Sequence, residues 1–107
     1  MSAAHPVPAS LIASIVETYA PRRIILFGSA ARGEARAGSD LDLLVELDDD
    51  APREALHWRR AWEARRGYEG AVDIIPQRAG SLLRRADLPG TLAREVLRDG
   101  VVVYERA

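Results

Sequence analysis

The hydrophobic and polar positions in the first half of the chain predict a helix followed by two strands. Residues 8–19 carry apolar side chains at helical spacing, and Pro21 is expected to close this helix. A short β-branched run at 22–27 predicts a buried strand. A second apolar run at 40–47 predicts another strand, although it begins with acidic residues.

The second half of the chain also alternates between segments with helical spacing and segments typical of strands. Acidic residues and Pro52 favour a helix start, and this helix is expected to run to Arg66 before Gly67 stops it. The other expected elements are a strand at 70–76 ended by Pro76, a short helix around Ser81–Arg85, a helix at 91–100 ended by Gly100, and a strand at 101–105. The pattern predicts an α/β (α+β) fold with a small mixed β-sheet and helices packed on one face.

Composition narrows the class of protein. The chain has 107 residues, enough for a single domain over 1–107, with 48% hydrophobic residues and a formal net charge of −1. No large electrostatic field is present, so neither a nucleic-acid nor a membrane partner is predicted. No segment resembles a signal peptide or is long enough to span a bilayer, and a cytoplasmic location is expected. Cysteine is absent, which excludes disulfides, thiolate zinc sites and cysteine nucleophiles.

Candidate chemistry begins with the acidic residues of the 40–47 run. Strand side chains alternate between faces. One face holds Leu41, Leu43, Val45 and Leu47, and the other holds Asp40, Asp42, Leu44 and Glu46. Asp40 and Asp42 would lie roughly 6.5–7 Å apart along the strand. Like charges at this separation raise each other's pKa unless a cation neutralises them, and an oxygen-only cluster suits Mg²⁺ or Mn²⁺.

A third carboxylate, Asp73, stands within the apolar run "AVDIIP". An aspartate inside a short apolar strand is costly unless it is paired or bound. If this strand lies beside 40–47, three carboxylates converge, and two metals there could activate a hydroxyl and stabilise a pyrophosphate leaving group. In the alternative interpretation the two residues have no catalytic role: Asp40 is a turn residue, and Asp42 prevents an edge strand from pairing with another chain.

The turn before the acidic strand is a candidate phosphate cradle. Gly28 allows close backbone approach, Ser29 can cap the turn or donate to a phosphate, and Arg32 can hold a phosphate oxygen. A plain strand–turn–helix corner is the alternative reading. A Walker A loop is excluded because the chain has no lysine.

Two tryptophans complete the set of unusual positions. Trp58 and Trp62 are spaced i, i+4 on the expected 52–66 helix. They are interpreted as core packing or a partner-facing patch rather than as a base-stacking platform.

The segment "FGSAARGEARAGSDLDLLV", in which ten residues separate Gly28-Ser29 from Asp40-Leu41-Asp42, resembles the signature of the DNA polymerase β-like nucleotidyltransferase superfamily. It is most similar to the minimal nucleotidyltransferases, or MNT domain proteins. The resemblance implies a nucleotidyltransferase fold and a reaction in which a hydroxyl attacks the α-phosphate of a nucleoside triphosphate and releases pyrophosphate.

The resemblance also implies a role for each matching residue. Gly28 and Ser29 would hold the triphosphate, and Arg32 and Ser39 would assist phosphate binding and loop structure. Asp40 and Asp42 would bind two Mg²⁺ ions. Asp73 would bind one of them and help to deprotonate the acceptor hydroxyl.

Minimal members of this family are commonly encoded beside a HEPN-domain protein in toxin–antitoxin pairs. The nucleotidyltransferase acts there as the antitoxin, in characterised examples by transferring AMP to a tyrosine of the HEPN toxin. The resemblance therefore implies ATP as co-substrate and a HEPN protein as partner. Two alternatives remain open: a non-catalytic antitoxin that masks its partner sterically, and a nucleotidyltransferase that acts on a small molecule such as an aminoglycoside.

Overall fold

The computed structural model describes residues 6–34 and 40–107. Its elements, in chain order, are α1 (Ala9–Tyr19), β1 (Arg23–Phe27), β2 (Leu41–Leu47), the short 3₁₀ helix η1 (Arg53–Leu56), α2 (Trp58–Ala64), β3 (Val72–Arg78), α3 (Ala79–Arg85), α4 (Leu92–Asp99) and β4 (Val101–Glu105). Every strand predicted from the sequence is present. No helix within the described ranges is both long and apolar enough to cross a membrane.

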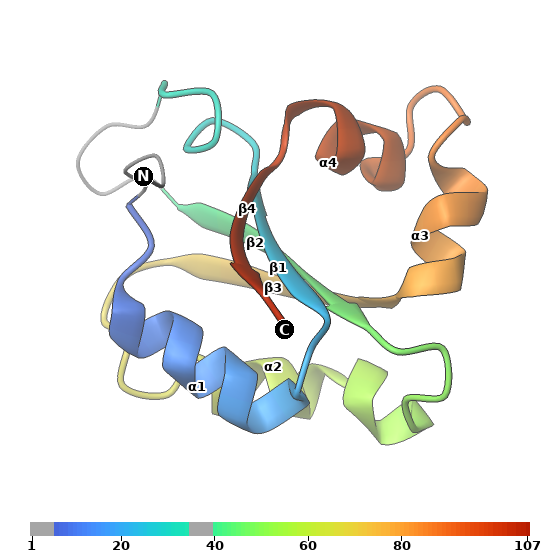
Figure 1. Cartoon of the computed structure of the whole chain (residues 1–107). Coiled ribbons are helices and arrows are strands. Elements are labelled where there is room, and N and C mark those ends of the chain that lie inside the picture. Colours follow the sequence, from blue (N-terminus) through green and yellow to red (C-terminus); the bar gives the residue numbers. More distant parts are fainter. Residues whose placement is uncertain (1–5, 35–39) are drawn as a thin grey trace.

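The strands form one mixed sheet in the order β3-β2-β1-β4 (Figure 1). β1 is antiparallel to both β2 and β4, whereas β2 and β3 are parallel. The register pairs Phe27 with Asp42 across β1 and β2, and Asp42 with Asp73 across β2 and β3. The end of β1 and the beginnings of β2 and β3 therefore meet at the same end of the sheet.

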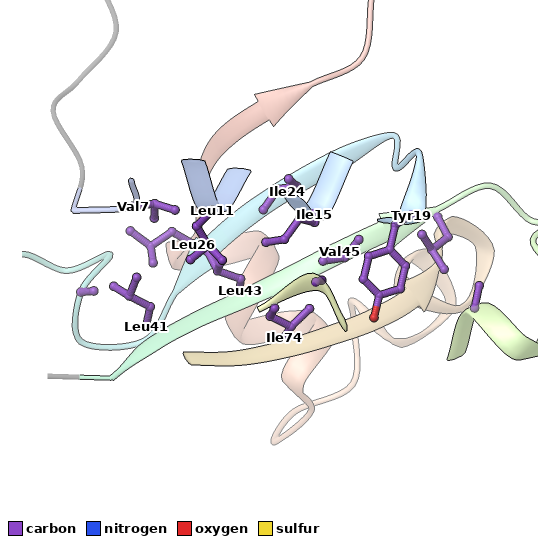
Figure 2. Packing of buried hydrophobic residues seen from close by; sticks show 14 residues of the cluster. Val7, Leu11, Ile15, Tyr19, Ile24, Leu26, Leu41, Leu43, Val45 and Ile74 are labelled. Atoms are coloured by element: carbon purple, nitrogen blue, oxygen red, sulfur yellow. The ribbon is translucent and has the colours of Figure 1, made fainter. Parts of the chain in front are cut away.

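The predicted α+β fold with a small mixed sheet is confirmed, and the helices cover both faces of this sheet rather than the single face expected (Figure 1). On one face, Leu43 and Val45 pack with Ile15 of α1 and Ile74 of β3 (Figure 2). On the other face, a second cluster joins strands β1 and β2 to α3 and α4: Ile25, Phe27, Leu44, Leu82, Ala93 and Val96. The second face is apolar around Ile25, Phe27 and Leu44, and burying these side chains requires a separate pair of helices.

Two local predictions also need correction. The single helix expected up to Arg66 is divided into η1 and α2, because His57 between them has an extended backbone with ψ 141°. Pro76 does not end its strand, since β3 continues to Arg78. β3 lies at the edge of the sheet, where one side of the backbone has no partner strand and proline is tolerated.

Candidate active site

The turn after β1 brings the chain directly against Asp42. Gly28 has a φ of +75°, and its carbonyl accepts a hydrogen bond from the Arg32 amide at 3.3 Å. The carbonyl of Ser29 accepts another from the Glu34 amide at 2.9 Å. A Cβ at position 28 would lie 2.5 Å from Oδ2 of Asp42. Glycine is therefore required here both by the backbone conformation and by the neighbouring carboxylate.

The carboxylates form a charged group at the start of β2 and β3. Asp42 is partly buried, whereas Asp40 and Asp73 are exposed. Asp42 and Asp73 are register partners on adjacent parallel strands, so the structure brings together two residues that are far apart in the sequence. The pKa of Asp42 is raised, mainly because burial disfavours its charge and further because Asp73, Asp40 and Glu95 repel it.

The residue types at this edge fit a hard divalent cation. Carboxylate oxygens are the ligands that Mg²⁺ prefers, and the repulsion felt by Asp42 is what a bound cation would relieve. In residues 6–34 and 40–107 as they stand, no three histidine, aspartate or glutamate side chains are arranged to hold a metal ion. The donor chemistry is therefore suitable, while the side chains are not in a coordinating arrangement.

Arg32 connects the turn to α4. Its guanidinium lies 3.3 Å from the Glu34 carboxylate and 3.9 Å from that of Glu95. A hollow of about 600 Å³ along the start of α4 is lined in part by Glu95, Arg94 and Arg98. Sequence reasoning missed Glu95, because an acidic residue in the first turn of a helix is ordinary and carries no signal of its own.

Of the two serines predicted to bind nucleotide, the structure describes only Ser29. Ser29 is half-buried within the Gly28–Glu34 turn, close in sequence to the glycine that contacts Asp42. Ser39 lies outside the described residues. The structure therefore describes six of the predicted site residues: Gly28, Ser29, Arg32, Asp40, Asp42 and Asp73.

Glu46 differs from Asp42 although both point to the same face of β2. Its carboxylate is buried, with 4% of the residue exposed, and accepts two hydrogen bonds from the Arg23 guanidinium at 2.8 and 2.9 Å. Arg23 and Glu46 are also register partners across β1 and β2. Glu46 is thus neutralised within the fold, whereas Asp42 faces other carboxylates.

A small mixed sheet that sets neighbouring carboxylates beside a glycine turn is the arrangement of a nucleotidyltransferase. Residues 10–107 match the family described as polymerase beta, nucleotidyltransferase. This match spans most of the chain, and the chain belongs to that family. No curated protein matches the chain.

Several solved structures share the fold, among them the three that follow. A toxin–antitoxin crystallised with AMP-PNP is 22% identical with a TM-score of 0.62, and a mutant of the toxin–antitoxin MntA-HpeT is 20% identical with a TM-score of 0.60. In both cases the alignment covers 94% of this chain and 75% of the other. A protein from Sulfolobus solfataricus, described as a candidate nucleotidyltransferase, is 24% identical with a TM-score of 0.54, over 94% of this chain and 92% of that one.

Proposed function

We propose that the protein is a Mg²⁺-dependent nucleotidyltransferase that moves AMP from ATP onto a hydroxyl group of a partner protein. The observation that carries this proposal is the pairing of Asp42 with Asp73 on adjacent strands, with Gly28 packed against the Asp42 carboxylate. Membership of the nucleotidyltransferase family supports the reaction class. The specific donor, acceptor and metal are part of the proposal.

The proposed reaction has one bond-forming and one bond-breaking event. The acceptor oxygen bonds to the α-phosphorus of ATP, the bond from that phosphorus to the bridging oxygen breaks, and pyrophosphate leaves. Asp73 takes the proton of the hydroxyl, and its exposed position at the start of β3 leaves it accessible to an acceptor. Bound Mg²⁺ would be held by Asp40, Asp42 and Asp73 and would supply positive charge against the phosphates and the leaving group.

The other proposed binding residues act on the triphosphate. The turn amides near Gly28 and Ser29 would face its oxygens, and Ser39 would also assist phosphate binding. Arg32 would exchange its exposed contacts with Glu34 and Glu95 for a phosphate oxygen. This exchange costs little, because exposed ion pairs are weak, while arginine binds phosphate well.

The acceptor in this proposal is a tyrosine of a HEPN-domain toxin, and the protein would act as its antitoxin. Two structures with the same fold are described as toxin–antitoxin proteins, and one of them was crystallised with AMP-PNP. Those descriptions concern the relatives. They support the choice of a protein acceptor and of an adenine nucleotide for this chain.

Transfer of label from ATP to a cognate HEPN-domain protein tests the proposal. ATP labelled at the α-phosphate should label the partner in the presence of Mg²⁺, whereas ATP labelled at the γ-phosphate should not. Label from the γ-phosphate would indicate phosphoryl transfer instead. Transfer to an aminoglycoside but not to the protein would favour the small-molecule alternative.

Steric masking of the toxin is the remaining alternative, and it makes a different prediction in cells. If masking suffices, neutralisation of the toxin survives Asp40→Ala and Asp42→Ala. If nucleotide transfer is required, both substitutions abolish neutralisation while the protein still accumulates to the wild-type level.

A further inference from the structure

Helix α2 exposes two large aromatic side chains that the fold does not use. Trp58 is 66% exposed and Trp62 is 57% exposed, and their i, i+4 spacing sets them on one face of the helix. The structure thereby excludes core packing as their role. Tryptophan buried at an interface contributes more to binding than most other residues, so this pair is costly to leave in water.

The opposite face of α2 is fixed to the rest of the protein. Ala64 is fully buried, and its carbonyl accepts a hydrogen bond from the Ser14 hydroxyl of α1 at 2.6 Å. The Arg60 guanidinium donates to the carbonyl of Thr18 at 3.1 Å. These contacts hold the helix rigidly with the tryptophans turned away from α1.

The neighbours of Trp58 hold its ring. The Arg59 guanidinium lies 5.8 Å from the centroid of the Trp58 ring, and the His57 ring lies 5.4 Å from it. A cation above an indole ring restricts its motion, which lowers the entropy lost when a partner binds. The exposed surface is therefore partly organised before any contact is made.

The charge around the tryptophans favours an acidic partner. Residues 53–66 contain five arginines and two glutamates, a formal charge of +3 in a chain whose net charge is −1. A hollow of about 590 Å³ in the same segment is lined by Arg53, Glu54, His57, Arg59, Arg60 and Glu63, and neither tryptophan lines it. A second copy of the chain would bring like charges together, which opposes self-association through this face.

The α2 face and the candidate active site lie on different sides of the sheet. α2 packs with α1 over the face that carries Leu41, Leu43 and Val45 (Figure 1). Asp42 belongs to the other face, with Leu44, and α4 approaches it there through Glu95. A protein bound at α2 would therefore leave the carboxylates and the Gly28 turn open to ATP.

We propose that the α2 face, defined by Trp58, Trp62 and Arg59 together with the exposed Arg66 in the turn that follows α2, is a docking surface for a protein with an apolar patch rimmed by acidic side chains. The proposal rests on the proposed function in one respect: the docked protein is the acceptor of the nucleotide. The tryptophans supply the apolar area, and the arginines supply orientation and faster association.

Binding of the HEPN-domain acceptor to the full chain, measured by calorimetry, tests the docking surface. The double variant Trp58→Ala/Trp62→Ala should raise the Kd at least tenfold. The variant Arg59→Glu/Arg66→Glu should raise it several-fold and reduce its dependence on salt. Matched controls on α3, Leu83→Ala and Arg84→Glu/Arg85→Glu, change an exposed apolar residue and two exposed arginines and should leave the Kd within twofold of the wild type.

ATP binding and the melting temperature should be unchanged in the α2 variants, which separates docking from misfolding. An unchanged Kd for the acceptor in the tryptophan variant would overturn the proposal. Binding of a single-stranded oligonucleotide that depends on both tryptophans, with acceptor binding unaffected, would overturn it as well. Failure of the proposed function has a different signature, in which the wild type binds the acceptor through α2 but transfers no nucleotide to it.

Discussion

At the scale of single residues, the site depends on the contact between Gly28 and Asp42. The glycine has a left-handed backbone conformation and leaves no space for a Cβ beside the Asp42 carboxylate. Asp42 in turn has a raised pKa, because it is partly buried and surrounded by Asp73, Asp40 and Glu95. The site therefore stores electrostatic repulsion in the free protein, which a bound cation would remove.

Substitution of Gly28 tests this contact directly. Gly28→Ala should cost roughly 1–2 kcal/mol from the left-handed backbone and should also displace the Asp42 carboxylate. Gly33→Ala is a matched control, since Gly33 has a φ of +74° and, apart from its chain neighbours, no atom of the described residues lies within 4 Å of an added Cβ. Both variants should lose similar stability in urea denaturation, but only Gly28→Ala should lose nucleotide transfer. Equal activity in the two variants would contradict the role of the contact.

The raised pKa of Asp42 predicts a pH dependence of stability. Its contribution is fully present below the ordinary pKa of 3.8 and is lost as the pH rises through the higher pKa of the folded state. Asp42→Asn should therefore gain stability over the wild type as the pH rises from below 3.8 to neutrality. Urea midpoints across that range measure the difference, with Asp87→Asn, an exposed carboxylate before α4, as control.

Addition of Mg²⁺ provides a second test of the role of Asp42. It should raise the melting temperature of the wild type at neutral pH and have a smaller effect on Asp42→Asn. In the pH series without Mg²⁺, a difference in urea midpoint between wild type and Asp42→Asn that stays the same at every pH would show that the fold does not disfavour the charge of Asp42.

At the scale of elements, β2 carries two acidic residues with different environments on one face. Glu46 is paired with Arg23 of β1, while Asp42 lies beside Asp73 of β3. The strand is thus anchored by an ion pair at one end and carries the candidate site at the other. The pair also raises the pKa of Arg23, chiefly through its hydrogen bond to Glu46.

Removal of the cation from this pair should destabilise the fold. Arg23→Met leaves the buried Glu46 without a partner and should cost roughly 3 kcal/mol, and Arg23→Met/Glu46→Leu should recover most of that loss. Arg106→Met, which breaks the exposed pair with Asp48, should leave the melting temperature close to that of the wild type. Equal losses for the buried and exposed pairs would contradict this assignment.

The sequence predicted the elements well where their signal is local. Alternation in 40–47 correctly separated Leu43 and Val45 from Asp42 and Leu44, because side-chain period alone decides the faces of a strand. The break at His57 was not predicted, since the residues around it are compatible with a continuous helix. The second helical layer was missed as well, although the unbroken apolar run in β1 is typical of a strand buried on both faces.

The pairing of Asp42 with Asp73 could only be a conditional prediction. It depends on parallel pairing of β2 and β3, which are joined through η1 and α2, and no local pattern specifies which strands become neighbours. In the structure, β2 and β3 are neighbours and pair in parallel, so Asp42 and Asp73 lie side by side. The roles of these residues in catalysis, together with that of Ser39, stay predictions.

At the scale of the whole molecule, two separate surfaces define the proposed activity. The carboxylates and the Gly28 turn lie at one end of the sheet, where β1 ends and β2 and β3 begin, on the α4 side. The exposed tryptophans of α2 lie in the layer that covers the opposite face. In the proposed activity, the acceptor docks at the α2 face while ATP binds at the carboxylates.

The intact mass of the HEPN-domain protein after incubation with this chain, ATP and Mg²⁺ tests the central claim most directly. Wild-type protein should add the mass of one or more AMP units to the acceptor, and omission of Mg²⁺ should prevent the addition. Asp42→Asn should add nothing, although it folds and still binds the acceptor. No added mass with any of the four nucleoside triphosphates, or equal addition by Asp42→Asn, would contradict the claim.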